Sequence, residues 1–303
     1  MRIFMTGATG YIGGSVATAL MARGAEVHGL VRSEERADEA RTHGIAPVMG
    51  TLDDAEILTE AAQAADVVIN TANADHGASA DTLVAALAGS GKRLLHTSGS
   101  SIVGKPDGGE LSEDVFDEDA AFTPSPGRAA RVEINRRVLA GADQGVHAVI
   151  ICPSLIYGLG TGAAKHSMQV PWLIDLARAD GAAKHIGPGA NTWSNVHIDD
   201  LVTLYLLALD KAPAGAFYYA ENGENSMREV CEAISRMLGL GGKAEAMTAE
   251  YAATIWGDGP AHNTMASNSR VRAKRARSEL GWAPGAPSLI EEIETGGYAT
   301  NYP

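Results

Sequence analysis

Three glycines near the start of the chain have the spacing needed to hold a phosphate group. Gly7, Gly10 and Gly13 follow an apolar run over residues 3–5 and precede a second apolar run over residues 15–21. A strand, a glycine turn and a helix in this order frame a dinucleotide-binding motif. Gly7 permits a tight turn, Gly10 lets the backbone approach a diphosphate, and Gly13 lets the helix pack close to the strand. The amides that open the helix then face the phosphates at the positive end of the helix dipole.

The residues at the end of the next apolar run indicate which dinucleotide binds. Arg32 and Ser33 follow residues 25–31, at the place where NAD-binding chains carry an acidic residue for the ribose 2′-hydroxyl. A guanidinium suits the 2′-phosphate of NADP, although an arginine can also simply lead a helix. The pattern predicts NADP (NADPH) as cofactor, with NAD as the alternative. Further cofactor contacts are expected from Thr9, Tyr11, Ile12, Leu52, Thr71, Ala72, Asn73, Thr97, Pro153 and Ser154.

Hydroxyl groups follow a predicted strand over residues 93–98 and are candidates for catalysis. Ser98 and Ser100 can polarise a substrate carbonyl by hydrogen bonding, or can satisfy the loop backbone. Reduction of a carbonyl also needs a proton donor. Tyr157, after the next strand, is the best phenol for that task, and the imidazoles of His76 and His166 are alternatives.

The elements that must position these residues alternate between strands and helices. This pattern predicts an α/β fold: a doubly wound (Rossmann) parallel sheet of about seven strands with helices on both faces. We expect residues 1–155, completed by about 191–220, to form the dinucleotide-binding core. Residues 156–190 and 221–303 would form a smaller substrate-binding region. Residues 105–126 indicate a long surface excursion, and Asp199 or Asp200 is the expected N-cap of a helix that runs to Leu209.

Bulk properties narrow the function classes. The formal net charge of −13 argues against a nucleic-acid surface. No apolar run reaches the length of about 18 residues that a membrane span needs, and no signal peptide is visible. Cys152 and Cys231 lie in apolar surroundings, which predicts buried thiols rather than a disulfide or a metal site. We therefore expect a cytoplasmic protein that acts on a small molecule without a metal, nucleic acid or membrane.

Four segments together resemble the extended short-chain dehydrogenase/reductases, the group of NAD-dependent epimerases and dehydratases. The segment over residues 6–13 is similar to the opening of that family, and residues 153–158 are similar to its Arg-Pro-x-x-x-Tyr-Gly segment, with Cys152 in place of the arginine. Residues 195–201 and 280–284 resemble its Phe-Val-His-Val-Asp-Asp-Val and Leu-Gly-Trp-x-Pro motifs. The resemblance implies a Rossmann fold. It also implies a homodimer, because the family often pairs the helices that match residues 78–90 and 128–142.

The chain departs from this family at the catalytic pair. The resemblance implies a Tyr-x-x-x-Lys motif on the helix before the sixth strand, but alignment places Gly127 at the tyrosine and Arg131 at the lysine. There is no tyrosine between Tyr11 and Tyr157. The resemblance implies a contact between Arg131 and the nicotinamide ribose, as a fixed charge that does not shuttle protons.

These observations predict an atypical NADP-dependent oxidoreductase that reduces a small carbonyl or enone compound with a non-standard proton donor. The alternative is a catalytically silent NADP-binding sensor or regulator that has kept the cofactor site. A sugar-nucleotide epimerase or dehydratase is the weaker third hypothesis, because such chemistry needs the missing acid–base residue.

Overall fold

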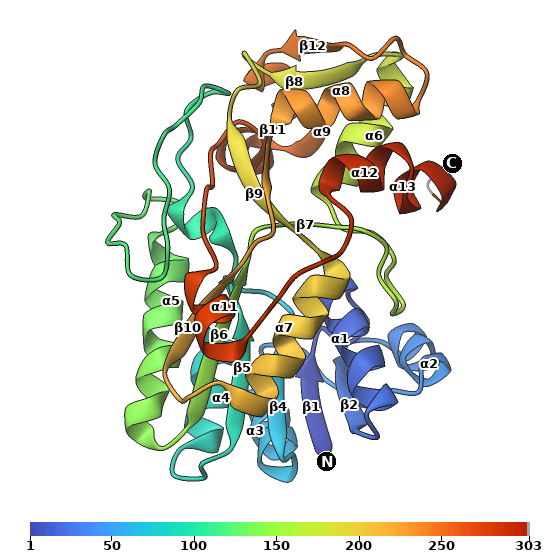
Figure 1. The fold of residues 1–303 in the computed structure, drawn as a ribbon. Helices are drawn as coiled ribbons and strands as arrows, with labels where there is room; N and C mark the ends of the chain where they lie inside the picture. Colours follow the sequence, from blue (N-terminus) through green and yellow to red (C-terminus); the bar gives the residue numbers. More distant parts are fainter. Residues whose placement is uncertain (302–303) are drawn as a thin grey trace.

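The computed structural model describes residues 1–301, and its centre is a seven-stranded parallel sheet (Figure 1). The strand order is β10-β6-β5-β4-β1-β2-β3. This arrangement confirms the predicted α/β Rossmann fold. The strands are β1 (Arg2–Thr6), β2 (Glu26–Val31), β3 (Ala46–Met49), β4 (Val67–Asn70), β5 (Arg93–Thr97), β6 (His147–Pro153) and β10 (Ala216–Ala220).

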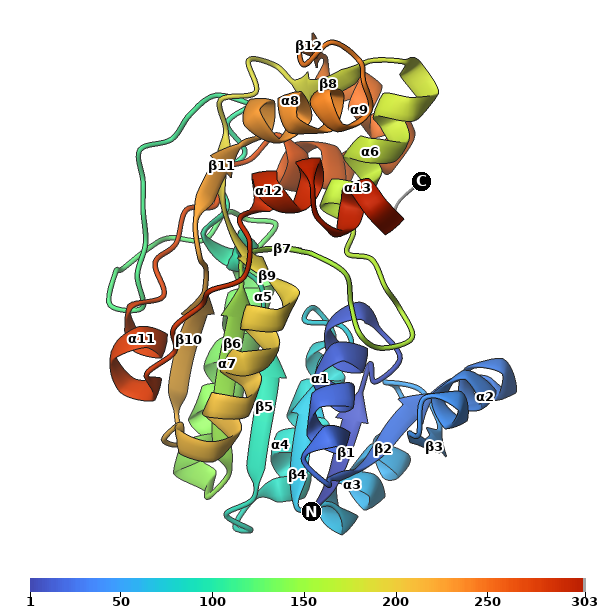
Figure 2. The ribbon, with the colours of Figure 1, turned by 45° about the vertical axis from the view of Figure 1, so that its right-hand side comes forward.

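Helices cover both faces of this sheet, which explains why its central strands are apolar along their length. On one face, α1 (Tyr11–Ala22) packs on α7 (Ile198–Lys211), and α7 packs on α11 (Lys274–Leu280). On the other face, α4 (Gly77–Leu87) lies between α3 (Ala55–Ala64) and α5 (Ala129–Ala140). The helix α2 (Glu34–Thr42) packs on β2 and β3, on the face that α1 covers. Figure 2 shows α1 and α7 side by side in front of the strands.

A second, smaller region lies beyond the carboxyl ends of the strands (Figure 1). It contains two small sheets, in the orders β11-β9-β7 and β12-β8. The short strands are β7 (Leu155–Tyr157), β8 (Ala183–Ile186), β9 (Thr192–His197), β11 (Glu224–Ser226) and β12 (Ala244–Met247). The helices are α6 (Gln169–Asp180), α8 (Met227–Met237), α9 (Ala249–Trp256), α10 (Asp258–Pro260), α12 (Leu289–Glu294) and α13 (Gly297–Asn301).

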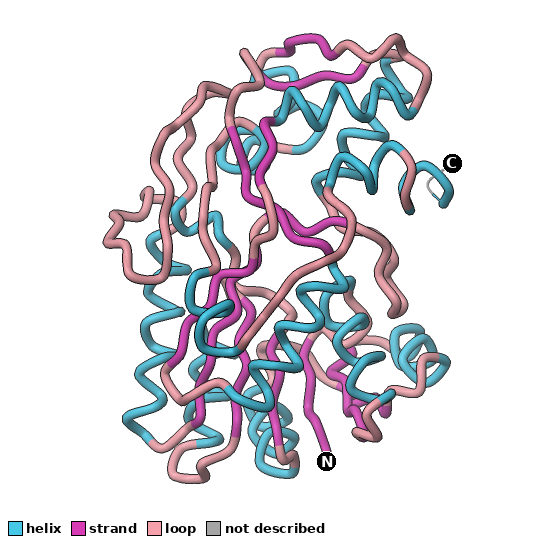
Figure 3. Tube along the Cα trace, in the orientation of Figure 1, coloured by secondary structure: helices cyan, strands magenta, loops and turns pink. Residues whose placement is uncertain are grey.

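Three short helical turns complete the assignment, and long loops join the two regions. The turns are η1 (Ser100–Val103), η2 (Gly141–Gln144) and η3 (Ala261–Met265). Residues 105–126 are drawn as loop in Figure 3, in agreement with the predicted excursion. This loop forms isolated bridges from Lys105 to Asn268 and from Phe116 to Val271. The C-terminal part of the chain therefore fastens the excursion to the sheet.

The molecule has two hydrophobic cores. The first surrounds the large sheet and takes in buried side chains of α11 and the loop after it, including Leu280 and Trp282. The second lies between α6, α8 and α12 and includes Tyr157. The proposed substrate region, residues 221–303, thus contributes to both cores. The division into functional regions stays a prediction.

Two local expectations have clear outcomes. Both cysteines are free and buried, as predicted. The N-cap of α7 is His197, whose ring nitrogen Nδ1 accepts a hydrogen bond from the Asp199 amide at 3.2 Å, so the expectation of Asp199 or Asp200 was wrong. Asp200 instead accepts hydrogen bonds from the amides of Gly285 and Ala286. None of the described helices is both long and apolar enough to cross a membrane.

Candidate cofactor and active site

The glycine turn folds into a cradle that admits no side chain. The Gly10 amide donates to the Gly7 carbonyl at 2.9 Å, and Gly7 has a φ of 72°, which favours glycine. A Cβ atom on Gly7 would lie 2.9 Å from the backbone of Thr71 and Ala72, so β1 and β4 approach each other closely here. β1 and β4 are also the strands at which the sheet order reverses, the place where open α/β sheets bind ligands.

The first helix leaves its amino end available above this cradle. Gly10 is the N-cap of α1 and provides no side-chain cap. The first amides of a helix have no partner within it and therefore seek an anion or water. Both features fit a dinucleotide diphosphate. The residues that would hold it are Gly7, Thr9, Gly10, Tyr11 and Ile12.

A cavity of about 610 Å³ extends from the cradle over the ends of β2 and β3. It brings together six of the predicted cofactor residues, which come from four separate loops. Sequence reasoning missed several further lining residues, of which Arg36 bears most on the cofactor. The predicted lining residues are Gly7, Thr9, Gly10, Arg32, Leu52 and Ala72, and the others are Leu30, Val31, Arg36, Gly50, Thr51, Asp53, His76 and Ala164.

Two arginines supply the positive charge of this cavity. Arg32 is exposed and makes no ion pair with any of residues 1–301, whereas Arg36 pairs with Glu39 on α2. Ser33 caps α2, because its hydroxyl oxygen accepts a hydrogen bond from the Arg36 amide at 3.3 Å. Asp53 carries the opposite charge, and it pairs with the ring of His76 at 3.1 Å. The free cation in this cavity is therefore Arg32.

Several predicted hydroxyls are engaged in bonds that stabilise the fold. Thr71 Oγ1 donates to the Thr6 carbonyl, Ser154 Oγ donates to the Ala220 carbonyl, and Tyr11 Oη donates to the Gly158 carbonyl. Thr97 Oγ1 bonds to Tyr205 on α7, so it faces away from the α5 side of the sheet. These contacts position the loops around the cradle. Pro153 ends β6 beside Ser154, and Asn73 accepts the Asp75 amide within its own turn.

The structure does not bring Tyr157 to the candidate serines. Its ring is fully buried in the second core and its hydroxyl donates to the Pro287 carbonyl at 2.8 Å. Burial, together with nearby carboxylates such as Asp200, raises the pKa of Tyr157 well above its usual range. This geometry argues against Tyr157 as the proton donor. Ser100 is also engaged, because it exchanges hydrogen bonds with Ser269 at the C-terminal end of the chain.

Ser98 is the candidate hydroxyl that faces α5. Its oxygen accepts a hydrogen bond from Asn135 Nδ2 at 2.8 Å, so its own proton remains available. The Cys152 thiol on the neighbouring strand β6 lies within hydrogen-bonding reach of Ser98. Burial raises the pKa of this thiol to about 12, so it stays protonated and unreactive. Ser98 is therefore held in a fixed position between Asn135 and Cys152.

Arg131 forms a bridge between two loops at the carboxyl ends of the strands. Its guanidinium makes a bidentate pair with Asp75, with Nε to Oδ1 at 2.7 Å, and also donates to Ser101 Oγ at 3.0 Å. The hydrogen bonds from Arg131 hold the pKa of Asp75 below its usual range. Gly127 lies in open space at the start of α5. Neither residue supplies the proton that a tyrosine would supply.

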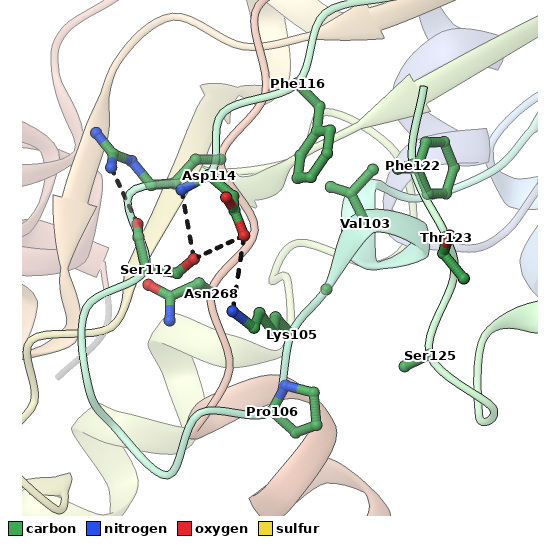
Figure 4. A pocket seen from close by; sticks show the side chains of 12 residues that line it. Val103, Lys105, Pro106, Ser112, Asp114, Phe116, Phe122, Thr123, Ser125 and Asn268 are labelled. Carbon is green, nitrogen blue, oxygen red and sulfur yellow. Dashed lines mark hydrogen bonds and ion pairs between the residues drawn. The ribbon is translucent and has the colours of Figure 1, made fainter. Parts of the chain in front are cut away.

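A second cavity, of about 380 Å³, lies between the excursion and the C-terminal segment (Figure 4). Val103, Phe116 and Phe122 form its apolar side, and the two phenyl rings meet edge to face at 5.9 Å. Lys105 and Asp114 lie on the opposite side and form an ion pair at 3.7 Å. The lining continues through Gly104, Pro106, Ser112, Thr123, Ser125, Asn268 and Arg270.

The cradle, the sheet reversal and the cavity define a dinucleotide-binding α/β enzyme, and comparison with known proteins gives the family. The chain belongs to the NAD dependent epimerase/dehydratase family, whose model matches residues 3–219.

Relatives and solved structures agree with this membership. The chain is 33% identical to "Oxidase ucsJ" of Acremonium sp, over 97% of this chain and 95% of that protein. It is 29% identical to the 4-hydroxy-2-methyl-3-oxo-4-farnesyl-3,4-dihydroquinoline-1-oxide ketoreductase of Stigmatella aurantiaca, over 74% and 69% of the two chains. The crystal structure of dTDP-glucose 4,6-dehydratase from Bacillus anthracis, in complex with NAD, matches its fold with a TM-score of 0.77 at 20% identity, covering 99% and 97%. The enzyme class, an NAD(P)-dependent oxidoreductase, follows from these relatives together with the family.

Proposed function

We propose that the chain uses NADPH to reduce the carbonyl group of a small, uncharged and partly apolar compound. The observation that carries the NADPH preference is Arg32, the free cation at the end of β2. A 2′-phosphate would complete its bidentate hydrogen bonding. Arg36, in the first turn of α2, lines the same cavity and is paired with Glu39. An acidic residue at this place would instead favour the 2′-hydroxyl of NAD.

The second cavity supports the substrate class. Its aromatic side fits an apolar portion, and its volume accommodates a small molecule. Both of its cations are neutralised by neighbours among the described residues: Lys105 by Asp107 and Asp114, and Arg270 by Glu224 and Glu113. No free positive charge is left in this cavity for a diphosphate. This argues for an uncharged ketone or enone and against a sugar nucleotide.

The cofactor and the chain have separate tasks in the proposed reaction. A bound NADPH supplies the hydride. The glycine cradle and the first turn of α1 orient the cofactor. The Ser98 hydroxyl, held by Asn135, donates a hydrogen bond to the substrate oxygen as negative charge develops there. Arg131 positions the loops after β4 and β5 by joining Asp75 to Ser101.

Substitution of Arg32 tests the cofactor preference. In Arg32→Ala we expect the Kd for NADPH to rise about fivefold to thirtyfold. A charge-assisted bond at an exposed site is worth about 1–2 kcal/mol, and 1.4 kcal/mol is a factor of ten. The Kd for NADH should not change. Arg41→Ala on α2, the helix that follows Arg32, serves as control, because Arg41 pairs with Asp38. Equal losses for both cofactors in Arg32→Ala would contradict the assignment.

A substrate panel tests the reaction. NADPH oxidation is followed by absorbance with alkyl ketones, aryl ketones, enones and, as the opposing class, UDP- and dTDP-sugars. We expect turnover with at least one uncharged carbonyl compound and none with the sugar nucleotides.

A silent NADP-binding sensor is the second candidate, because Gly127 and Arg131 replace the family's catalytic pair. Tight NADPH binding without oxidation by any member of the panel would favour the sensor.

A further inference from the structure

The hydroxyl groups of the buried tyrosines differ in one respect that bears on the missing proton donor. Tyr11, Tyr157, Tyr205 and Tyr218 each use their hydroxyl in a hydrogen bond within the chain. Tyr251 and Tyr298 also have hydroxyl partners. Among residues 1–301, the remaining tyrosine, Tyr219, has no hydrogen bond to its hydroxyl, although the residue is only 1% exposed. Its oxygen is not among the fully buried, unpartnered polar atoms of the described residues, so it keeps some accessible surface and its proton is not tied to another group of the chain.

The register of the sheet places Tyr219 on the same face as Ser98. Cys152 on β6 pairs with Tyr219 on β10, and Thr97 on β5 pairs with Ile151 on β6. Thr97 faces α7, and so does its paired residue Ile151. Side chains alternate along a strand, so the residues after them, Ser98 and Cys152, face α5.

The Tyr219 side chain points to the same face as that of Cys152, because paired residues in a parallel sheet point to the same side. Its neighbour Tyr218 points to the opposite face, where its hydroxyl donates to Glu279 at 2.9 Å.

Three adjacent strands therefore carry a row of Ser98, Cys152 and Tyr219 at their carboxyl ends. The backbones of β5 and β10 are two strand spacings, or about 10 Å, apart. The Cys152 thiol lies between them: it is within reach of the Ser98 hydroxyl and interacts electrostatically with the Tyr219 phenol. No other described tyrosine combines this face of the sheet with an unbonded hydroxyl.

The excursion that walls the second cavity also holds Tyr219. Glu118 Oε1 accepts the Tyr219 amide at 3.1 Å, and Glu118 lies on the segment between Phe116 and Phe122. Phe217 meets the Tyr219 ring edge to face at 5.0 Å, which fixes the ring orientation. The phenol is thus positioned by Phe217 and by the loop segment that joins Phe116 to Phe122, two lining residues of the proposed substrate pocket.

We propose that Tyr219 is the proton donor of this enzyme and takes the role left open at Gly127. This proposal rests on the proposed carbonyl reduction. In the step, the carbonyl carbon accepts hydride from the reduced nicotinamide, the carbon–oxygen π pair moves onto oxygen, and oxygen takes the proton from Tyr219 Oη. The phenolate then recovers a proton from water as the alcohol leaves.

The surroundings of the phenol favour the reductive direction. Burial raises the pKa of Tyr219 well above its usual range, and smaller contributions come from the nearby groups Cys152, Glu118 and Asp117. The phenol therefore stays protonated at ordinary pH and can donate to a developing alkoxide. Alcohol oxidation needs the phenolate as base, so the oxidation rate should rise with pH while the reduction rate stays flat through neutral pH.

Tyr219→Phe and Tyr218→Phe form a matched pair that tests the proposal. Both remove one hydroxyl from adjacent residues on opposite faces of β10. For Tyr219→Phe we expect kcat with the panel's substrate to fall about 100-fold to 10,000-fold, the range for a lost general acid, with the Kd for NADPH unchanged. Tyr218→Phe should keep kcat within about threefold. Activity retained in Tyr219→Phe would overturn the proposal.

Two measurements keep the proposal testable without a known substrate. Because the hydroxyl has no partner, Tyr219→Phe should unfold at the same or a slightly higher temperature than the native chain, and a marked decrease would show a structural role instead. In a crystal structure with NADPH, Tyr219 Oη should face the nicotinamide across a space that fits one carbonyl group. A phenol walled off from the nicotinamide would overturn the proposal, whereas an absence of turnover with every carbonyl compound would overturn only the proposed function.

Discussion

Substitution of Gly13 by alanine should disturb the proposed cofactor site while the rest of the fold stays intact. A Cβ at this position would lie 2.8 Å from the Gly7 carbonyl carbon and closer still to the Gly7 oxygen and Thr71 Oγ1. The atoms in the way are mainly backbone atoms of the cradle, which cannot rotate aside. Overpacking of this kind costs about 1–3 kcal/mol, partly offset by the gain of about 0.5–1 kcal/mol when alanine replaces glycine in a helix. The net expectation is a loss of up to about 2.5 kcal/mol in unfolding free energy, with the turn displaced.

Gly14→Ala is the matched control for this substitution. Its Cβ would lie 3.2 Å from Gly162 Cα and 3.4 Å from the Ala8 carbonyl oxygen, distances that a small shift relieves. We expect a change in unfolding free energy near zero. Urea denaturation gives the stabilities, and NADPH fluorescence gives the Kd. Gly13→Ala should weaken NADPH binding, by about tenfold for each 1.4 kcal/mol of binding free energy lost when the turn is displaced, and Gly14→Ala should not. Unimpaired binding by Gly13→Ala would refute the close packing of helix and turn.

Three further predictions concern buried polar groups. Burial, together with the nearby charge of Arg131, lowers the pKa of His96 in the folded chain to about 4. Below about pH 6.5 the unfolded chain therefore binds more protons than the folded chain, and the unfolding free energy decreases as the pH is lowered. Between pH 7 and pH 5 this amounts to about 2 kcal/mol in urea denaturation, and His96→Gln should remove that part of the slope; an unchanged slope would contradict it. Asp200→Ala should cost about 2–3 kcal/mol in unfolding free energy, because two amides lose a charged acceptor, whereas Asp199→Ala on the exposed side should change it little. The buried Cys152 and Cys231 should react with a thiol reagent only after unfolding, and modification of the native chain would contradict their burial.

The sequence motifs predicted the fold and the tight glycine turn well, because both depend on local patterns. Strand, turn and helix are adjacent in the chain, and the spacing of Gly7, Gly10 and Gly13 carries their geometry directly. Arg36 was missed, although its place in the first turn of the helix that follows Arg32 was a usable signal, because that turn lies beside the end of β2.

The surroundings of the candidate catalytic residues were harder to predict because their partners are distant in sequence. Tyr157 was the expected phenol, yet its partner Pro287 lies 130 residues further on. Arg131 meets Asp75 across 56 residues. Tyr219 depends on the register of three strands, and no single segment of the sequence reveals that register.

The hydrogen bonds between Ser100 and Ser269 have a consequence for biosynthesis. They join positions 169 residues apart, and the Ser269 amide also bonds to the Thr192 carbonyl. A ribosome must therefore synthesise the chain beyond residue 269 before the loop after β5 acquires its final support. Contacts of such long range slow folding, so nascent chains should collapse around the large sheet first and form the contacts of Ser269 last.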